Sequence, residues 1–98
     1  MATAQKIIAD IDAHMQARGG TNSDWYVGIA ADPRERLFVA HCVDEKNDVW
    51  IFRQADSHTI ARAVEKAYHA VGCKGSHGGG DDTTTFVYAY RITPSTSE

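Results

Sequence analysis

The chain has 98 residues, of which 43% are apolar and 23% charged, and its formal net charge is -3. These proportions are typical of a globular domain and exclude a disordered, collagen-like or coiled-coil chain. No apolar run approaches the roughly 20 residues of a membrane span, and the N-terminus lacks the basic flank and apolar core of a signal peptide. We therefore expect one soluble, cytoplasmic domain over residues 1–93, without a membrane partner, and a disordered polar tail over residues 94–98.

The N-terminal half predicts a helix, a strand and a second helix. Residues 3–17 place apolar side chains on one stripe, as an amphipathic helix does, and Gly19-Gly20 ends that helix. Residues 25–30 alternate as a strand does. Asp32-Pro33-Arg34-Glu35 then predicts the start of a helix that fades near His41. The aspartate can cap the first turn, the proline suits its first position, and the glutamate can complete a capping box.

The C-terminal half predicts a strand, a third helix and a final strand. Residues 49–53 form the first of these strands, and Asp56 or Ser57 caps the third helix. The core stripe expected for that helix consists of Ile60, Val64, Ala67 and Val71. Residues 84–92 form the longest strand. The expected fold is α+β, a small three-stranded sheet packed by about three helices. Its strand polarity stays open, because helical connections favour parallel neighbours but three strands can also mix.

One part of the chain resembles a known family. WYVGIAADPRERLFVAH is similar to the second half of the GIY-YIG nuclease motif, with a Tyr-x-Gly strand at Tyr26-Val27-Gly28, an arginine before a leucine at Arg36-Leu37, and a histidine a turn later at His41. In that family a later helix supplies a glutamate that binds a divalent metal, and Glu65 takes that place here. The resemblance covers residues 25 to about 72. It implies a GIY-YIG-like fold and Mg²⁺-dependent cleavage of nucleic acid.

The first tripeptide of the family motif is missing. In the family it lies on a strand before the Tyr-x-Gly strand, and its tyrosine is usually assigned to activate the attacking water. Here the predicted first helix and a loop occupy that place, and no Gly-x-Tyr occurs upstream. A GIY-YIG-like sheet would therefore lack a strand or use residues 84–92 in its stead.

A candidate site also follows from the residues themselves. Tyr26 and Gly28 share a strand face, and Gly28 leaves room for a ligand. Glu65 lies at the edge of a helical core stripe, where a carboxylate can meet a cation, and Arg36 can neutralise phosphoryl charge. We therefore predict Tyr26, Arg36 and Glu65 as catalytic residues, Glu65 as the Mg²⁺ ligand, and Gly28 and His41 as ligand contacts. The alternative is that all three residues are structural. Tyr26 is then a half-buried strand aromatic, Arg36 a solvated charge on a helix, and Glu65 an ion-pair partner at helical spacing.

The loop over residues 75–82 is rich in glycine. It is not a phosphate-binding P-loop, because no Lys-Ser/Thr follows and the next element is a strand. Gly79 and Gly80 let the backbone approach a partner closely, so we predict them as ligand contacts, and Asp81-Asp82 can hold a hard cation. The alternative is a flexible loop that leads into the last strand.

Two other patterns favour structural roles. The segment His41-Cys42 and the pair Cys73 and His77 lack the paired spacing of zinc ligands, and Cys73 is expected to pack as a small core residue. The aromatic residues of the predicted strands are expected to pack in the core and on the sheet face. A nucleic-acid stacking platform would be surrounded by Lys and Arg, whereas the neighbouring loops are acidic.

Two functional hypotheses follow. The absent first tyrosine favours a GIY-YIG-like binding or interaction module that has lost catalysis and whose acidic loops, residues 44–48 and 80–82, face a basic protein surface. The alternative is a Mg²⁺-dependent nuclease or phosphodiesterase in which Arg36 and Glu65 act, with Tyr26 as the tyrosine of the motif. Because the overall charge is acidic, nucleic acid is the weaker prediction of a partner.

Overall fold

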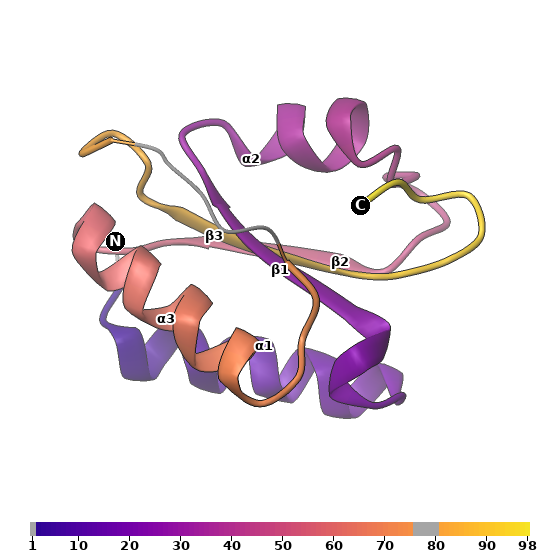
Figure 1. Ribbon diagram of the computed structural model, residues 1–98, viewed down its shortest axis with the longest axis horizontal. Coiled ribbons are helices and arrows are strands. Elements are labelled where there is room, and N and C mark those ends of the chain that lie inside the picture. The colour runs from indigo at the N-terminus through magenta and orange to yellow at the C-terminus, as the bar shows by residue number, and fades with distance from the viewer. Residues whose placement is uncertain (1, 76–80) are drawn as a thin grey trace.

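The computed structural model describes residues 2–75 and 81–98 (Figure 1). Its elements are α1 (Ala4–Arg18), β1 (Trp25–Ala30), α2 (Pro33–Glu35), β2 (Trp50–Gln54), α3 (His58–Ala70) and β3 (Phe86–Arg91). A 3₁₀ turn at Asn22–Asp24 precedes β1, and a π-helical turn at Arg36–Ala40 continues α2. The fold is α+β, as the sequence predicts. Within the described ranges no helix has the length and apolar character needed to cross a membrane.

The last strand in the sequence is the middle strand of the sheet. β3 lies between β1 and β2 and is antiparallel to both, which decides the polarity that the sequence left open. In this register Tyr88 of β3 lies opposite Gly28 of β1 on one side and opposite Phe52 of β2 on the other. The outer edge of β1 is extended by Lys74, whose carbonyl accepts from Val27 N at 2.9 Å.

Helices cover both faces of the sheet. α1 and α3 lie side by side on one face, and α2 with its π-helical turn lies on the other (Figure 1). Strand alternation divides the core accordingly. The first layer contains Ile7, Ile11, Trp25, Val27, Val64, Tyr68, Val87 and Ala89, and Cys73 is buried in it as expected. The second layer contains Tyr26, Ala30, Leu37, Val43, Tyr88 and Tyr90.

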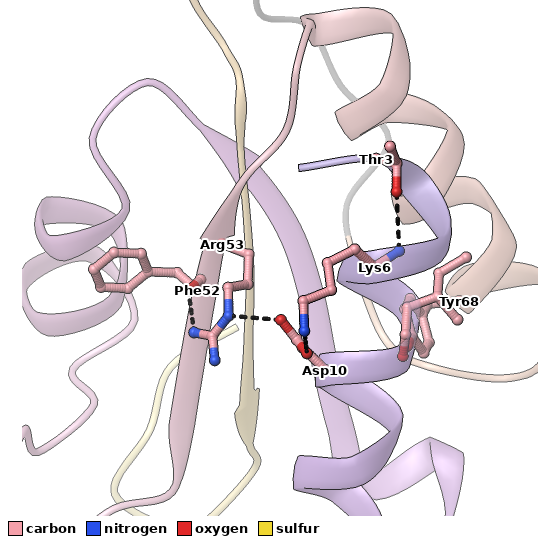
Figure 2. A network of polar contacts seen from close by, with 7 residues as sticks. Thr3, Lys6, Asp10, Phe52, Arg53 and Tyr68 are labelled. Carbon is pink, nitrogen blue, oxygen red and sulfur yellow. Dashed lines mark hydrogen bonds and ion pairs between the residues drawn. The ribbon is translucent and has the colours of Figure 1, made fainter. Parts of the chain in front are cut away.

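A polar network ties α1 to β2 outside the apolar core (Figure 2). The carboxylate of Asp10 accepts from Lys6 Nζ at 3.0 Å and from Arg53 Nε at 3.1 Å. Hydrogen bonds from Lys6 and Arg53 hold the pKa of Asp10 below its usual range. Arg53 also donates to the carbonyl of Phe52 at 2.8 Å. Exposed ion pairs contribute little free energy, so the apolar core beneath this network supplies most of the stability of the contact between α1 and the sheet.

The predicted core stripe of the third helix is confirmed at Val64 and in part at Ile60, but it is wrong at Ala67 and Val71, which are exposed. Its buried side chains are Ala61, Val64, Glu65 and Tyr68, whereas Val71 is 58% exposed. The cap is Ser57, whose side chain accepts from Ile60 N at 3.2 Å. Ala61, Val64 and Tyr68 follow one another at helical spacing on the buried face, and the Tyr68 hydroxyl donates to Asp12 Oδ1 of α1 at 2.7 Å. Glu65 is consequently buried rather than at the edge of the stripe.

Candidate functional site

Three tyrosines and a histidine meet on the face of the sheet that α2 covers. We call Tyr26, His41, Tyr88 and Tyr90 the tyrosine–histidine cluster. The ring of Tyr26 stacks on that of Tyr90 with 5.2 Å between centroids, and it lies 4.5 Å from the imidazole of His41. The strands place the tyrosines there because positions 26, 88 and 90 all fall on one side of the pleat. Each of the four residues is at most 4% exposed.

The π-helical turn brings Arg36 and His41 to the same tyrosine. Asp32 caps the preceding helix by accepting from Glu35 N at 3.2 Å, as the sequence predicts. The bond from His41 N to Arg36 O, at 2.8 Å, then closes a wide turn, a feature found often at functional sites. A hydrogen bond to Tyr88 raises the pKa of Arg36. Arg36 at the start of this turn and His41 at its end therefore both form hydrogen bonds with the Tyr88 hydroxyl.

A chain of hydrogen bonds passes through His41. Its Nε2 lies 2.7 Å from Tyr88 Oη, and its Nδ1 lies 2.7 Å from the carbonyl oxygen of Ser97. Burial lowers the pKa of His41, so the ring is neutral at pH 7. A carbonyl only accepts, so Nδ1 carries the proton and Nε2 accepts from the Tyr88 hydroxyl. The Tyr88 oxygen keeps its lone pairs for other donors, among them Arg36.

The Tyr88 hydroxyl is neutral at physiological pH. Burial, together with the neighbouring Tyr26, raises the pKa of Tyr88 to about 12, and the hydrogen bond from Arg36 opposes this. The charge of Glu65 on α3 makes a small further contribution to the increase. Tyr88 thus lies beside Tyr26 and forms hydrogen bonds with both Arg36 and His41.

The structure places the residues predicted from the sequence in different settings. Tyr26 and His41 lie inside the cluster, and Arg36 lies at its surface on Tyr88. Glu65 is 7% exposed and belongs to the opposite layer. The room beside Gly28 is filled by Tyr88, since a Cβ built there would stand 2.5 Å from Tyr88 Oη. Gly79 and Gly80 lie outside the described residues.

Sequence reasoning missed Tyr88, Tyr90 and Ser97 as members of the site. The alternation within residues 84–92 already puts both tyrosines on one strand face. What it lacks is the register against β1, which depends on tertiary pairing. Ser97 gives no signal, because it contributes only its backbone.

The sequence predicts Glu65 as a Mg²⁺ ligand. In the part of the chain that the structure describes, no group of three or more His, Cys, Asp or Glu side chains could hold a metal ion. Mg²⁺ nevertheless binds many sites through one or two carboxylates, with waters and substrate phosphate oxygens as its other ligands. Glu65 is the buried carboxylate that the sequence predicts for this role, and it lies on α3, in the layer opposite Tyr88. Of the residues in the zinc pattern, Cys42 is exposed and Cys73 is buried.

No protein-family model, curated protein or solved structure matches this chain. The GIY-YIG-like resemblance of residues 25–72 therefore stays a prediction. The geometry itself offers a neutral phenol that donates to a neutral imidazole, with a surface guanidinium on the same phenol oxygen. In such an arrangement the guanidinium can bind an anion, and the imidazole can accept a proton through the phenol.

Proposed function

We propose that this chain is a Mg²⁺-dependent phosphodiesterase that cleaves nucleic acid, with a GIY-YIG-like site in which Tyr88 supplies the second tyrosine. The position of Tyr88 carries the proposal, because it lies opposite Gly28 of the Tyr-x-Gly strand and bonds to both Arg36 and His41. The missing first tyrosine was the reason to favour a module without catalysis. A tyrosine delivered by β3 removes that reason, and residues 84–92 are the strand that the sequence offered as a substitute.

The hydrogen-bond chain permits proton transfer without a tyrosinate. As a water oxygen forms its bond to phosphorus, its proton passes to Tyr88 Oη, and the hydroxyl proton of Tyr88 passes to His41 Nε2. The imidazolium that results donates from Nδ1 to the Ser97 carbonyl, which stabilises it. The bond from phosphorus to the leaving oxygen breaks, and solvent protonates that oxygen. This route suits a phenol with a pKa of about 12, which does not ionise at neutral pH.

Arg36 and Glu65 have complementary roles in this proposal. The Arg36 side chain lies at the surface and bonds to Tyr88, so it can hold a phosphate oxygen beside the phenol. Glu65 would hold Mg²⁺, which polarises a phosphate oxygen when it is bound. Tyr26 packs against His41 and Tyr88 and keeps both rings in place.

The binding module remains a second candidate, favoured by one observation. Tyr88 is 1% exposed, and a buried hydroxyl that has found a partner is often purely structural. In that case the exposed acidic loop over residues 44–48 would contact a basic protein partner, and the cluster would only hold α2 on the sheet.

A cleavage assay tests the proposal. The purified chain is incubated with fluorescent single-stranded DNA, duplex DNA and RNA, with Mg²⁺ or with EDTA. We expect cleavage only with Mg²⁺ and a rate at least about 100-fold lower in Tyr88→Phe, as is usual when an acid–base group is lost. Glu65→Gln, which removes the proposed Mg²⁺ ligand, should also lower the rate and raise the Mg²⁺ concentration needed for cleavage. Tyr68→Phe is the matched control, because it removes a buried phenol hydroxyl from the opposite layer.

Two results would overturn the proposal. The first is that the wild-type chain cleaves none of the three substrates when Mg²⁺ is present. The second is cleavage by Tyr88→Phe at the rate of Tyr68→Phe. In either case the module becomes the better account, and its acidic loop is the surface to test next.

A further inference from the structure

The end of the chain returns to the tyrosine–histidine cluster. Ser97 N donates to the carbonyl of His41 at 2.7 Å, and the Ser97 carbonyl accepts from His41 Nδ1 at 2.7 Å and from Tyr90 Oη at 3.2 Å. A turn precedes these contacts, with Thr96 N donating to Thr93 O at 3.2 Å. We call residues 93–97 the strap. The sequence predicts disorder beyond residue 93, whereas here the peptide groups of Ser97 lie against His41.

The contacts of the strap concern one ring nitrogen of His41. Nδ1 has two oxygen neighbours, the Ser97 carbonyl at 2.7 Å and Tyr90 Oη at 3.2 Å. The carbonyl can only accept, so it requires a proton on Nδ1. The Tyr90 hydroxyl can donate, and while the strap is in place it donates to Ser97 instead. Without the strap the same hydroxyl can donate to Nδ1, which requires the opposite tautomer.

The tautomer decides what His41 can do for Tyr88. With the proton on Nδ1, Nε2 is bare and accepts from the Tyr88 hydroxyl across 2.7 Å. With the proton on Nε2, the ring donates to Tyr88 instead and cannot take its proton. The Ser97 carbonyl therefore decides whether the His41 ring can accept a proton from Tyr88.

We infer that the strap is a positioning element: the Ser97 carbonyl holds His41 in the Nδ1–H tautomer, which keeps Nε2 as the proton acceptor for Tyr88. The tautomer is a property of the chain by itself. Its consequence for cleavage rests on the proposed function. Because the strap acts through the peptide groups of Ser97, the side chain at this position is immaterial, which supplies a matched control.

Nitrogen NMR of the histidine rings tests the inference without any substrate. In the ¹⁵N-labelled full-length chain at neutral pH, His41 is assigned by comparison with His41→Gln. We expect a protonated Nδ1 and a bare Nε2. In a chain that ends at Thr93 we expect the His41 pattern to reverse or to average between tautomers, whereas Ser97→Ala keeps the full-length pattern. Backbone amide spectra check that the shortened chain keeps the shifts of α1 and α3.

The full-length chain can overturn the inference even if the shortened chain does not fold. A bare Nδ1 on His41 in the full-length protein would refute it, and so would an unchanged Nδ1–H tautomer in a folded chain that ends at Thr93. A cleavage assay on the same proteins gives the functional consequence, for which we expect kcat to fall at least about 10-fold in the shortened chain with KM nearly unchanged. If the wild-type chain does not cleave, the proposed function fails, and the NMR result still decides the role of the strap.

Discussion

Gly28→Ala tests whether the close approach of Tyr88 to β1 is a real constraint. A Cβ at position 28 would stand 2.5 Å from Tyr88 Oη, 2.6 Å from Cζ and 3.0 Å from Cε1, whereas ordinary contacts begin near 3.4 Å. The phenol must therefore move by nearly 1 Å. Tyr88 is 1% exposed, and the rings of Tyr26 and His41 lie beside it at 6.2 and 5.5 Å between centroids, so a shift of the phenol disturbs packed neighbours.

The expected cost combines three terms. Overpacking of a filled core costs about 1–3 kcal/mol. Loss of the 2.7 Å bond from Tyr88 to His41 costs a further ~0.5–1.5 kcal/mol. Against these, alanine restricts the unfolded chain more than glycine does and stabilises by roughly 0.4–1 kcal/mol. We expect the free energy of unfolding to fall by about 0.5–4 kcal/mol, which is significant against the ~5–15 kcal/mol typical of a domain. Urea unfolding followed by tryptophan fluorescence measures this difference.

A second background isolates the steric cause. In Tyr88→Leu the hydroxyl and Cζ that meet the new methyl group are gone. There Gly28→Ala should be neutral or slightly stabilising, because only the effect on the unfolded chain remains. A cost below about 0.5 kcal/mol in the wild-type background, or the same cost in both backgrounds, would refute the reasoning.

Three further predictions concern the other layer and the thiols. Tyr68→Phe removes the 2.7 Å bond to Asp12 and should lower the free energy of unfolding by about 1–2 kcal/mol in urea, and an unchanged midpoint would count against it. Burial lowers the pKa of His14, so the folded state binds fewer protons than the unfolded state and stability should fall as pH drops below 6.5. His14→Phe should reduce that loss between pH 7.5 and 5, and equal losses in the two proteins would contradict the assignment. Burial raises the pKa of Cys73 to about 11 while Cys42 is exposed, so a thiol reagent should label one cysteine quickly in the native chain and both in urea. Rapid labelling of both in the native chain would contradict this.

Much of the secondary structure could be predicted locally. The alternation of residues 25–30 predicts the limits of β1 correctly, and Asp32-Pro33 correctly marks the start of α2. These signals work because period and capping chemistry depend on neighbours in the chain. The core stripe of α3 was wrong at its C-terminal end because Val71 is as apolar as a core residue but is exposed, whereas Tyr68, with a polar hydroxyl, is buried against α1.

The candidate site divides along the same line. The sequence by itself determined the Tyr-x-Gly strand, the helix that carries Arg36 and His41, and the shared face of Tyr88 and Tyr90, because each follows from the spacing of residues close together in the chain. Only the tertiary structure decided that β3 is the central strand and that Tyr88 lies opposite Gly28. Alternation with period two specifies which face a side chain takes but not which strand lies beside it. That choice depends on how the helices bury the sheet and on pairing between residues about 60 positions apart. The return of Ser97 to His41 is of the same kind, since a backbone carbonyl leaves no trace in the sequence.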